Sequence, residues 1–162
     1  MRYDVETAAA TLFANYLNAV ASTQPGYVLD PAACPIVTFF DPMSVADADR
    51  VVVMCPTATT DIPDAGRFQA TMDIGVKTQW TQATITAQFK MHFARVNDVR
   101  DKLMLAPLAL ATALVPYLPQ GMAVDFVQPQ KHFSTHIAES STSKWIYSGT
   151  QLDIVGYFTA GT

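Results

Sequence analysis

Clusters of basic residues are missing from this chain. Its 162 residues include 10 lysines and arginines against 14 aspartates and glutamates, which gives a formal net charge of −4. The densest basic group is interleaved with acids, in the order Arg95, Asp98, Arg100, Asp101 and Lys102. Proteins that bind nucleic acid tightly present a basic patch or stripe to the phosphates. The composition therefore argues against tight binding of DNA or RNA.

Charge of either sign is also scarce. Charged residues make up 15% of the chain, where an ordinary soluble domain has about 25%. One interpretation is a large uncharged surface that permanent protein–protein interfaces cover. The other is a weakly charged monomer, since much of any monomer's surface is apolar. Composition alone leaves both open.

Disulfide and export signals are lacking as well. The two cysteines, Cys34 and Cys55, are each followed by proline. Two cysteines in a chain of this length do not form a disulfide framework, so we expect two small buried hydrophobic residues. The N-terminal segment has acids where a signal peptide needs basic residues, and no apolar core follows it.

One long uncharged stretch, residues 103–124, needs a separate explanation. A membrane helix requires about 20 consecutive apolar residues. Pro107, Pro116 and Pro119 interrupt this stretch, and prolines at such spacing break a helix. The stretch predicts a short buried helix over residues 108–115 and no membrane span.

Hydrophobic periodicity predicts the remaining elements. Apolar residues at helical spacing indicate helices, and apolar–polar alternation indicates strands. The expected helices are 4–20, 83–105 and 108–115, and the expected strands are 36–40, 50–54, 68–77, 121–127 and 145–158. Residues 41–49 and 56–66 form acidic, proline-containing loops, and a polar segment follows residue 127. Bulky residues on both faces of 145–158 predict a central or covered strand.

These elements predict one α+β domain over residues 1–162. Helices and strands are segregated in the order α-β-β-β-α-(α)-β-β, which favours helices packed on a mostly antiparallel sheet. We expect one stripe of each long helix to face this sheet. In the first helix the stripe is Val5, Ala9, Leu12, Phe13, Tyr16, Leu17 and Val20. In the second it is Ile85, Phe89, Phe93, Val96 and Leu103, with His92 and Val99 beside it.

The sequence offers few residues for chemistry. His132 and His136 are four residues apart and Glu139 follows them. The second residue of the metalloprotease motif is absent because Phe133 stands in its place. A zinc site needs three or four convergent ligands, and a polar, hairpin-like segment does not supply them. No nucleotide-binding glycine loop and no nucleophile elbow occur. We therefore expect no enzyme activity, no metal and no cofactor.

Three segments carry a resemblance to a known family. They are FARVNDVRDKLM at 93–104, GMAVDFV at 121–127 and SSTSKWIYSGTQLDIVGYF at 140–158. They resemble, in order, a helix, the strand after it, and the closing turn and long strand of the tail-terminator or tail-completion proteins. These proteins lie at the head–tail neck of long-tailed bacteriophages. The likeness covers about the C-terminal half of the chain.

The resemblance implies a virion structural protein made in the host cytoplasm. Such a protein forms a homo-hexameric ring that terminates the tail tube and joins it to the head–tail connector. Its partners would be further copies of itself, the tail tube protein and the connector proteins. DNA would pass through the lumen without specific binding, and no catalytic residues or membrane are involved. A small soluble α+β enzyme or ligand-binding domain is the alternative.

A ring predicts where the charged residues lie. We expect the two acidic loops to contact neighbouring subunits or the tube, because long loops on a rigid scaffold tend to carry function. The candidates for an acidic lumen are Asp41, Asp47, Asp49, Asp61 and Asp64. An outer solubilising rim is an equal alternative for these acids. Arg95 and Arg100, on the mixed-charge helix, are the expected subunit contacts.

Overall fold

A computed structural model describes residues 5–23, 28–38, 49–60, 66–104, 107–138 and 144–158. The helices are α1 (Val5–Thr23), α2 (Ile85–Leu103) and α3 (Pro107–Leu114), with a short 3-10 turn, η2, at Val115–Tyr117. The strands are β1 (Ile36–Thr38), β2 (Arg50–Thr60), β3 (Arg67–Trp80), β4 (Met122–Ala138) and β5 (Lys144–Phe158). This order confirms the predicted α+β fold.

The strands form one five-stranded sheet in the order β1-β2-β3-β5-β4. The pair β1–β2 is parallel, and the other three pairs are antiparallel. Strand β5 lies between β3 and β4, which confirms the predicted central strand. Its pairing with β3 runs without interruption from Arg67 opposite Tyr157 to Trp80 opposite Lys144. The C-terminal strand therefore links the two halves of the sheet.

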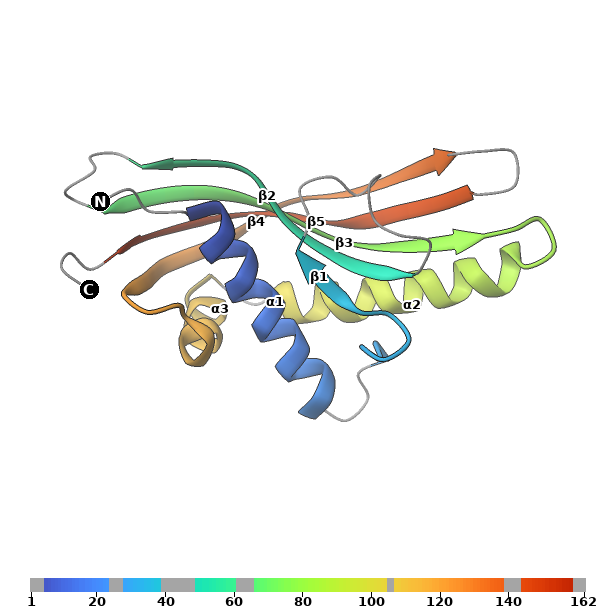
Figure 1. The fold of residues 1–162 in the computed structure, drawn as a ribbon, viewed down its shortest axis with the longest axis horizontal. Coiled ribbons are helices and arrows are strands. Elements are labelled where there is room, and N and C mark those ends of the chain that lie inside the picture. The colour runs from blue at the N-terminus through green and yellow to red at the C-terminus, as the bar shows by residue number, and fades with distance from the viewer. Residues whose placement is uncertain are drawn as a thin grey trace.

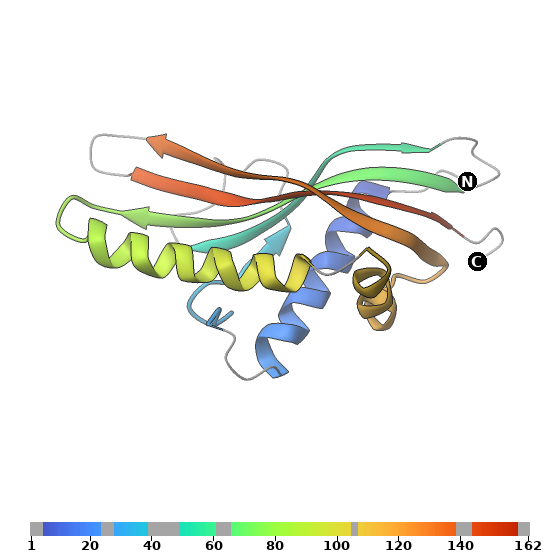
Figure 2. The same cartoon turned by 180° about the vertical axis from the view of Figure 1, so that it is seen from behind.

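Among the described residues, the three α-helices all pack on one face of the sheet, and the other face carries none of them (Figures 1 and 2). The predicted stripe of α1 is confirmed, because all seven of its residues are buried. They pack with Val53, Met72, Ile74, Leu152 and Ile154 of the sheet. The Tyr16 hydroxyl donates a hydrogen bond to the Lys102 carbonyl (2.9 Å), which ties α1 to the end of α2. The helix-covered face is therefore the main core.

Two strands are longer than predicted. Strand β2 continues through Pro56 to Thr60, so the expected loop 56–66 begins inside a strand. Strand β4 continues through the expected polar segment to Ala138. Both contain register shifts, at Met54/Thr57 in β2 and at Val124/Phe126 and Pro129/Lys131 in β4. Bulges and an edge position accommodate proline and polar residues in a strand, and a long partner strand supplies the hydrogen bonds.

The face that helix α2 buries differs from the predicted one. Its buried residues are His92, Arg95, Val96, Val99 and Leu103. Phe93, expected in the core, is 43% exposed. At 100° per residue the buried face centres near Val99, and Phe93 lies about 120° away from it around the helix axis. The periodicity was misleading because a histidine and an arginine occupy inward positions that apolarity alone does not reveal.

A second apolar cluster lies on the helix-free face. It contains Val52, Trp145 and Tyr147, with Met54 and Phe133 packed against it. The Lys77 ammonium lies 4.3 Å from the centre of the Trp145 ring, and Lys77 is fully buried. A side chain at Gly75 would come within 2.6 Å of the Tyr147 ring, so glycine there makes room for the aromatic ring. Burial therefore extends to part of both faces of the sheet.

Candidate functional site

Polar side chains in the middle of the helix-free face bind one another. Thr71 donates to the Asp153 carboxylate (2.9 Å), and Gln130 donates to its other oxygen (3.0 Å). Gln151 donates to Asp73 (3.1 Å). These bonds link β3, β5 and β4 across the sheet. Because each carboxylate already has donors, this part of the face has an evident structural role.

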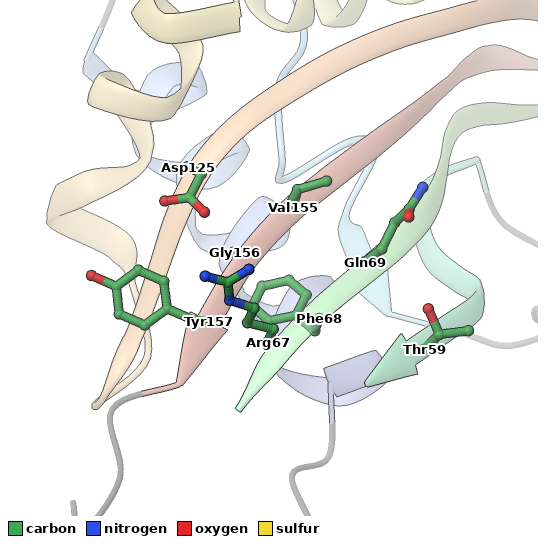
Figure 3. A pocket seen from close by; sticks show the side chains of 8 residues that line it. All are labelled: Thr59, Arg67, Phe68, Gln69, Asp125, Val155, Gly156 and Tyr157. Atoms are coloured by element: carbon green, nitrogen blue, oxygen red, sulfur yellow. The ribbon is translucent and has the colours of Figure 1, made fainter. Parts of the chain in front are cut away.

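A hollow opens at one end of the same face (Figure 3). Its volume is about 390 Å³, within the range of roughly 300–1,000 Å³ usual for ligand sites. It lies where β2 and β5 end and where β3 and β4 begin. The lining residues are Thr59, Arg67, Phe68, Gln69, Asp125, Val155, Gly156 and Tyr157. Strand ends distant in sequence therefore bring one cation, one acid and several hydrogen-bonding groups together.

The polar residues of the hollow have no partners within the described part of the chain. Arg67, Gln69, Asp125 and Tyr157 make no side-chain hydrogen bond or ion pair there. Tyr157 is 43% exposed, and Phe126 beside the hollow is 37% exposed. Tyrosine, arginine and phenylalanine are enriched at protein–protein interfaces. The hollow has the composition of a recognition surface rather than of a stabilising contact.

The outward side of α2 is a second surface of this kind. Five exposed residues follow one another at helical spacing and form a narrow stripe. This outer stripe consists of Lys90, Phe93, Asn97, Asp101 and, just after the helix, Met104. Phe93 and Met104 are among the exposed large hydrophobic residues, at 43% and 48%. Lys90 and Asp101 are unpaired among the residues described. One helix thus carries a buried face and an unsatisfied outer face.

The inward side of α2 holds a polar network instead. His92 is fully buried, and its ring nitrogens contact the hydroxyls of Thr78 (2.8 Å) and Ser148 (2.9 Å). Ser148 in turn contacts the Ser134 hydroxyl (2.8 Å). A serine beside a histidine is the geometry of an activated nucleophile. Here Ser148 is fully buried, and the second ring nitrogen faces a hydroxyl where an orienting carboxylate would be needed. The network fixes α2 on the sheet.

Two of the residues predicted as interface contacts bind each other. Arg95 donates a hydrogen bond to the Asp49 carboxylate (2.9 Å), and Arg95 is only 6% exposed. The other Asp49 oxygen accepts a hydrogen bond from the backbone N–H of Gln79 (3.0 Å). This pair joins the start of β2 to α2 and the end of β3. Both charges therefore have partners inside the subunit, and their predicted interface role stays a prediction.

The other predicted contacts divide between described and undescribed segments. Arg100 donates to the Gly149 carbonyl (3.3 Å), and burial lowers its pKa. Asp41, Asp47, Asp61 and Asp64 lie outside the described residues. Their expected place in a lumen stays a prediction.

The two spaced histidines lie on a strand. His132 and His136 both belong to β4, and Glu139 lies outside the described residues. The His132 ring contacts the Thr150 hydroxyl (3.0 Å), and its pKa is lowered by burial and then by the charge of Arg100. In the described ranges no three histidine, cysteine or acidic residues gather as metal ligands would. The helices described there are also too short or too polar to cross a membrane.

Comparison with known proteins adds no family. No protein-family model matches the chain, and no curated protein matches it. The residues of the hollow were missed by sequence reasoning, because Arg67, Asp125 and Tyr157 come from three strands and form no linear motif. The outer stripe was missed because Phe93 was assigned to the core.

Proposed function

We propose that this chain is a structural subunit of the neck of a long-tailed bacteriophage. It forms a ring that terminates the tail tube and joins the tube to the head connector. The resemblance of three segments to tail-terminator proteins carries the proposal. Its expected partners are further copies of the chain, the tail tube protein and the connector, with DNA passing through the lumen unbound.

The placement of these segments supports the proposal. Residues 93–104 fall on α2, 121–127 begin β4, and the described part of 140–158 is β5. These elements contact one another, since β4 pairs with β5 and α2 bonds to β5 through His92 and Arg100. The likeness therefore covers one packed unit and not three scattered fragments.

The distribution of unsatisfied surface also supports an assembly role. The hollow and the outer stripe offer exposed aromatic and apolar residues, and charged residues that have no partner in the described part of the chain, on two separate parts of the subunit. A ring needs two different surfaces that fit each other. Among the described residues, the histidines, cysteines and charged side chains either contact other groups inside the fold or lie apart from one another on the surface.

Mass spectrometry of purified virions tests the proposal. Particles of a phage that encodes this chain should contain it in a fixed low copy number, near the six of one hexameric ring. Deleting its gene should leave heads and tails that do not join, or tails of irregular length, in electron micrographs. Virions that lack the protein, or normal particles after deletion, would refute the proposal.

The hollow favours a second candidate, a small ligand-binding domain. A cavity of about 390 Å³ with one cation and one acid suits a small zwitterion. A thermal-shift screen of free amino acids distinguishes the two. A binder should gain about 2.7 kcal/mol at a ligand concentration of 100 times Kd, whereas a ring subunit should not respond.

A further inference from the structure

We propose that the outer stripe of α2 in one subunit docks on the hollow of the next copy. The outer stripe is Lys90 to Met104 on the exposed side of α2, and the hollow is the Arg67–Asp125–Tyr157 site. This inference rests on the proposed function for its reason to assemble, and it names the contact between subunits. The occupant of the hollow is then a second copy of this chain.

The charges of the two surfaces complement each other. The hollow presents Arg67 and Asp125, one of each sign, and neither has a partner among the described residues. The outer stripe presents Asp101 and Lys90, again one of each sign and unpaired there. Docking offers Asp101 a cation and Lys90 an acid. Complementary charges of this kind fix the register of an interface and raise its association rate.

The apolar residues of the two surfaces also match. Phe93 and Met104 project from the outer stripe, while Tyr157 and Phe126 stand at the hollow. Each of the four is more than a third exposed, so each has apolar area left to bury. Removal of this area from water supplies the driving force of association. Asn97, at the middle of the stripe, can hydrogen bond to the unpaired Gln69 amide or the Tyr157 hydroxyl.

The position of the two surfaces favours a head-to-tail contact. The hollow opens on the helix-free face, at the end where β3 and β4 begin (Figure 3). Helix α2 lies under the other half of the sheet, on the opposite face (Figures 1 and 2). A single subunit therefore cannot satisfy its own hollow with its own stripe. Contacts between two different surfaces repeat from copy to copy and close into a ring when the rotation permits.

Strand pairing between copies is the competing mode of assembly. The free edge of β4 is its natural place, since β4 ends the sheet. That strand contains two register shifts, Pro129 and the exposed Lys131. Bulges, proline and lysine are the features that protect an edge from adding another strand. The structure thus disfavours the edge and leaves the side-chain surfaces as the contact.

A charge exchange in the full-length chain tests the contact. Arg67→Glu places two acids opposite each other, and Asp101→Lys places two cations opposite each other. Sedimentation velocity should show each single variant assembling at least about tenfold more weakly than the wild type, and the double variant within about threefold of it. Both residues are exposed, so circular dichroism and the melting temperature should stay unchanged. Lys131→Glu, on β4 outside both surfaces, is the matched control and should assemble normally.

The outcomes separate this contact from the proposed function. Assembly weakened by each single reversal and restored by the double variant supports the contact. A wild type that assembles while the reversals change nothing overturns it, and so does a double variant as weak as the single ones. A wild type that stays monomeric at every concentration also overturns it. None of these results removes the protein from the virion, where mass spectrometry decides the function independently.

Discussion

The two sides of α2 differ in what their polar groups do. On the inward side, Arg95 binds Asp49 and His92 binds two hydroxyls. On the outward side, Lys90 and Asp101 have no partner in the described structure, and Phe93 is half exposed. The inward groups are committed to the stability of the subunit. The outward groups contribute little to it and remain free for another molecule.

The helix-free face of the sheet repeats this contrast. Its middle joins Asp153 to Thr71 and Gln130 by hydrogen bonds, while Arg67 and Asp125, in the hollow at its end, have no partner among the residues described. Removing a polar residue that has a partner inside the chain lowers the stability of the folded protein. A residue without one should change assembly and leave stability alone. Paired substitutions can separate these two roles.

The largest expected effect comes from the ion pair of Arg95 and Asp49, whose side chains are 8% and 20% exposed. Arg95→Met leaves the Asp49 carboxylate without its cation and should lower the free energy of unfolding by about 3–5 kcal/mol. Lys90→Met, a matched change on the same helix, should stay within about 0.5 kcal/mol. Urea denaturation followed by circular dichroism measures both. Equal costs would show that the two sides of α2 do not differ as described.

A second pair compares apolar residues on the same helix. Leu103 is fully buried, so Leu103→Ala should cost about 2–5 kcal/mol. Phe93→Ala should cost only about 0.5–1.5 kcal/mol, from its edge-to-face contacts with Phe89 and His92. Thermal unfolding checks the order of the two. A Phe93→Ala variant as unstable as Leu103→Ala would show that Phe93 belongs to the core.

A smaller effect is expected on the helix-free face. Gln151→Ala removes the donor to Asp73 and should cost about 0.5–1.5 kcal/mol. Gln69→Ala, in the hollow on the neighbouring strand, removes no bond to any residue that the structure describes and should cost almost nothing. The same urea titrations report both values. A cost for Gln69 as large as that for Gln151 would contradict the division of this face.

The smallest expected effect concerns the thiols. Cys34 and Cys55 are buried thiols that form no disulfide within the described residues, and burial raises the pKa of Cys34 to about 11. Only the thiolate reacts, and a raised pKa lowers its population at every pH below that value. Neither cysteine should react with an aromatic disulfide reagent in the native protein at pH 8, and both should react in urea. Rapid native labelling of Cys34 would contradict its buried position.

Much of the fold could be predicted from periodicity. Amphipathic stripes such as that of α1, and the alternation in β3 and β5, report burial directly because the main core is apolar. The predicted ends of β2 and β4 were wrong because the proline-containing loop from Pro56 and the polar segment after residue 127 indicated loops, whereas cross-strand pairing and bulges keep both segments in strands. Local signals cannot show such compensation by a partner strand.

The candidate site was much harder to predict. Arg67, Asp125 and Tyr157 are ordinary surface residues until the strand order β3-β5-β4 brings their ends together. Arg95 was expected at a subunit contact because it lies on a mixed-charge helix, and its partner Asp49 is 46 residues away. Pairings between distant residues depend on tertiary structure, and a single sequence does not encode them in any visible pattern.

A cryo-electron microscopy map of the assembled chain is the most direct test of the central claim. We predict a closed ring in which Asp101 of each copy faces Arg67 of the next, with Phe93 packed against its neighbour's Tyr157. Arg95 and Asp49 should stay paired inside each subunit, as in the single chain. A ring that leaves the hollow and the outer stripe open to solvent would contradict the account.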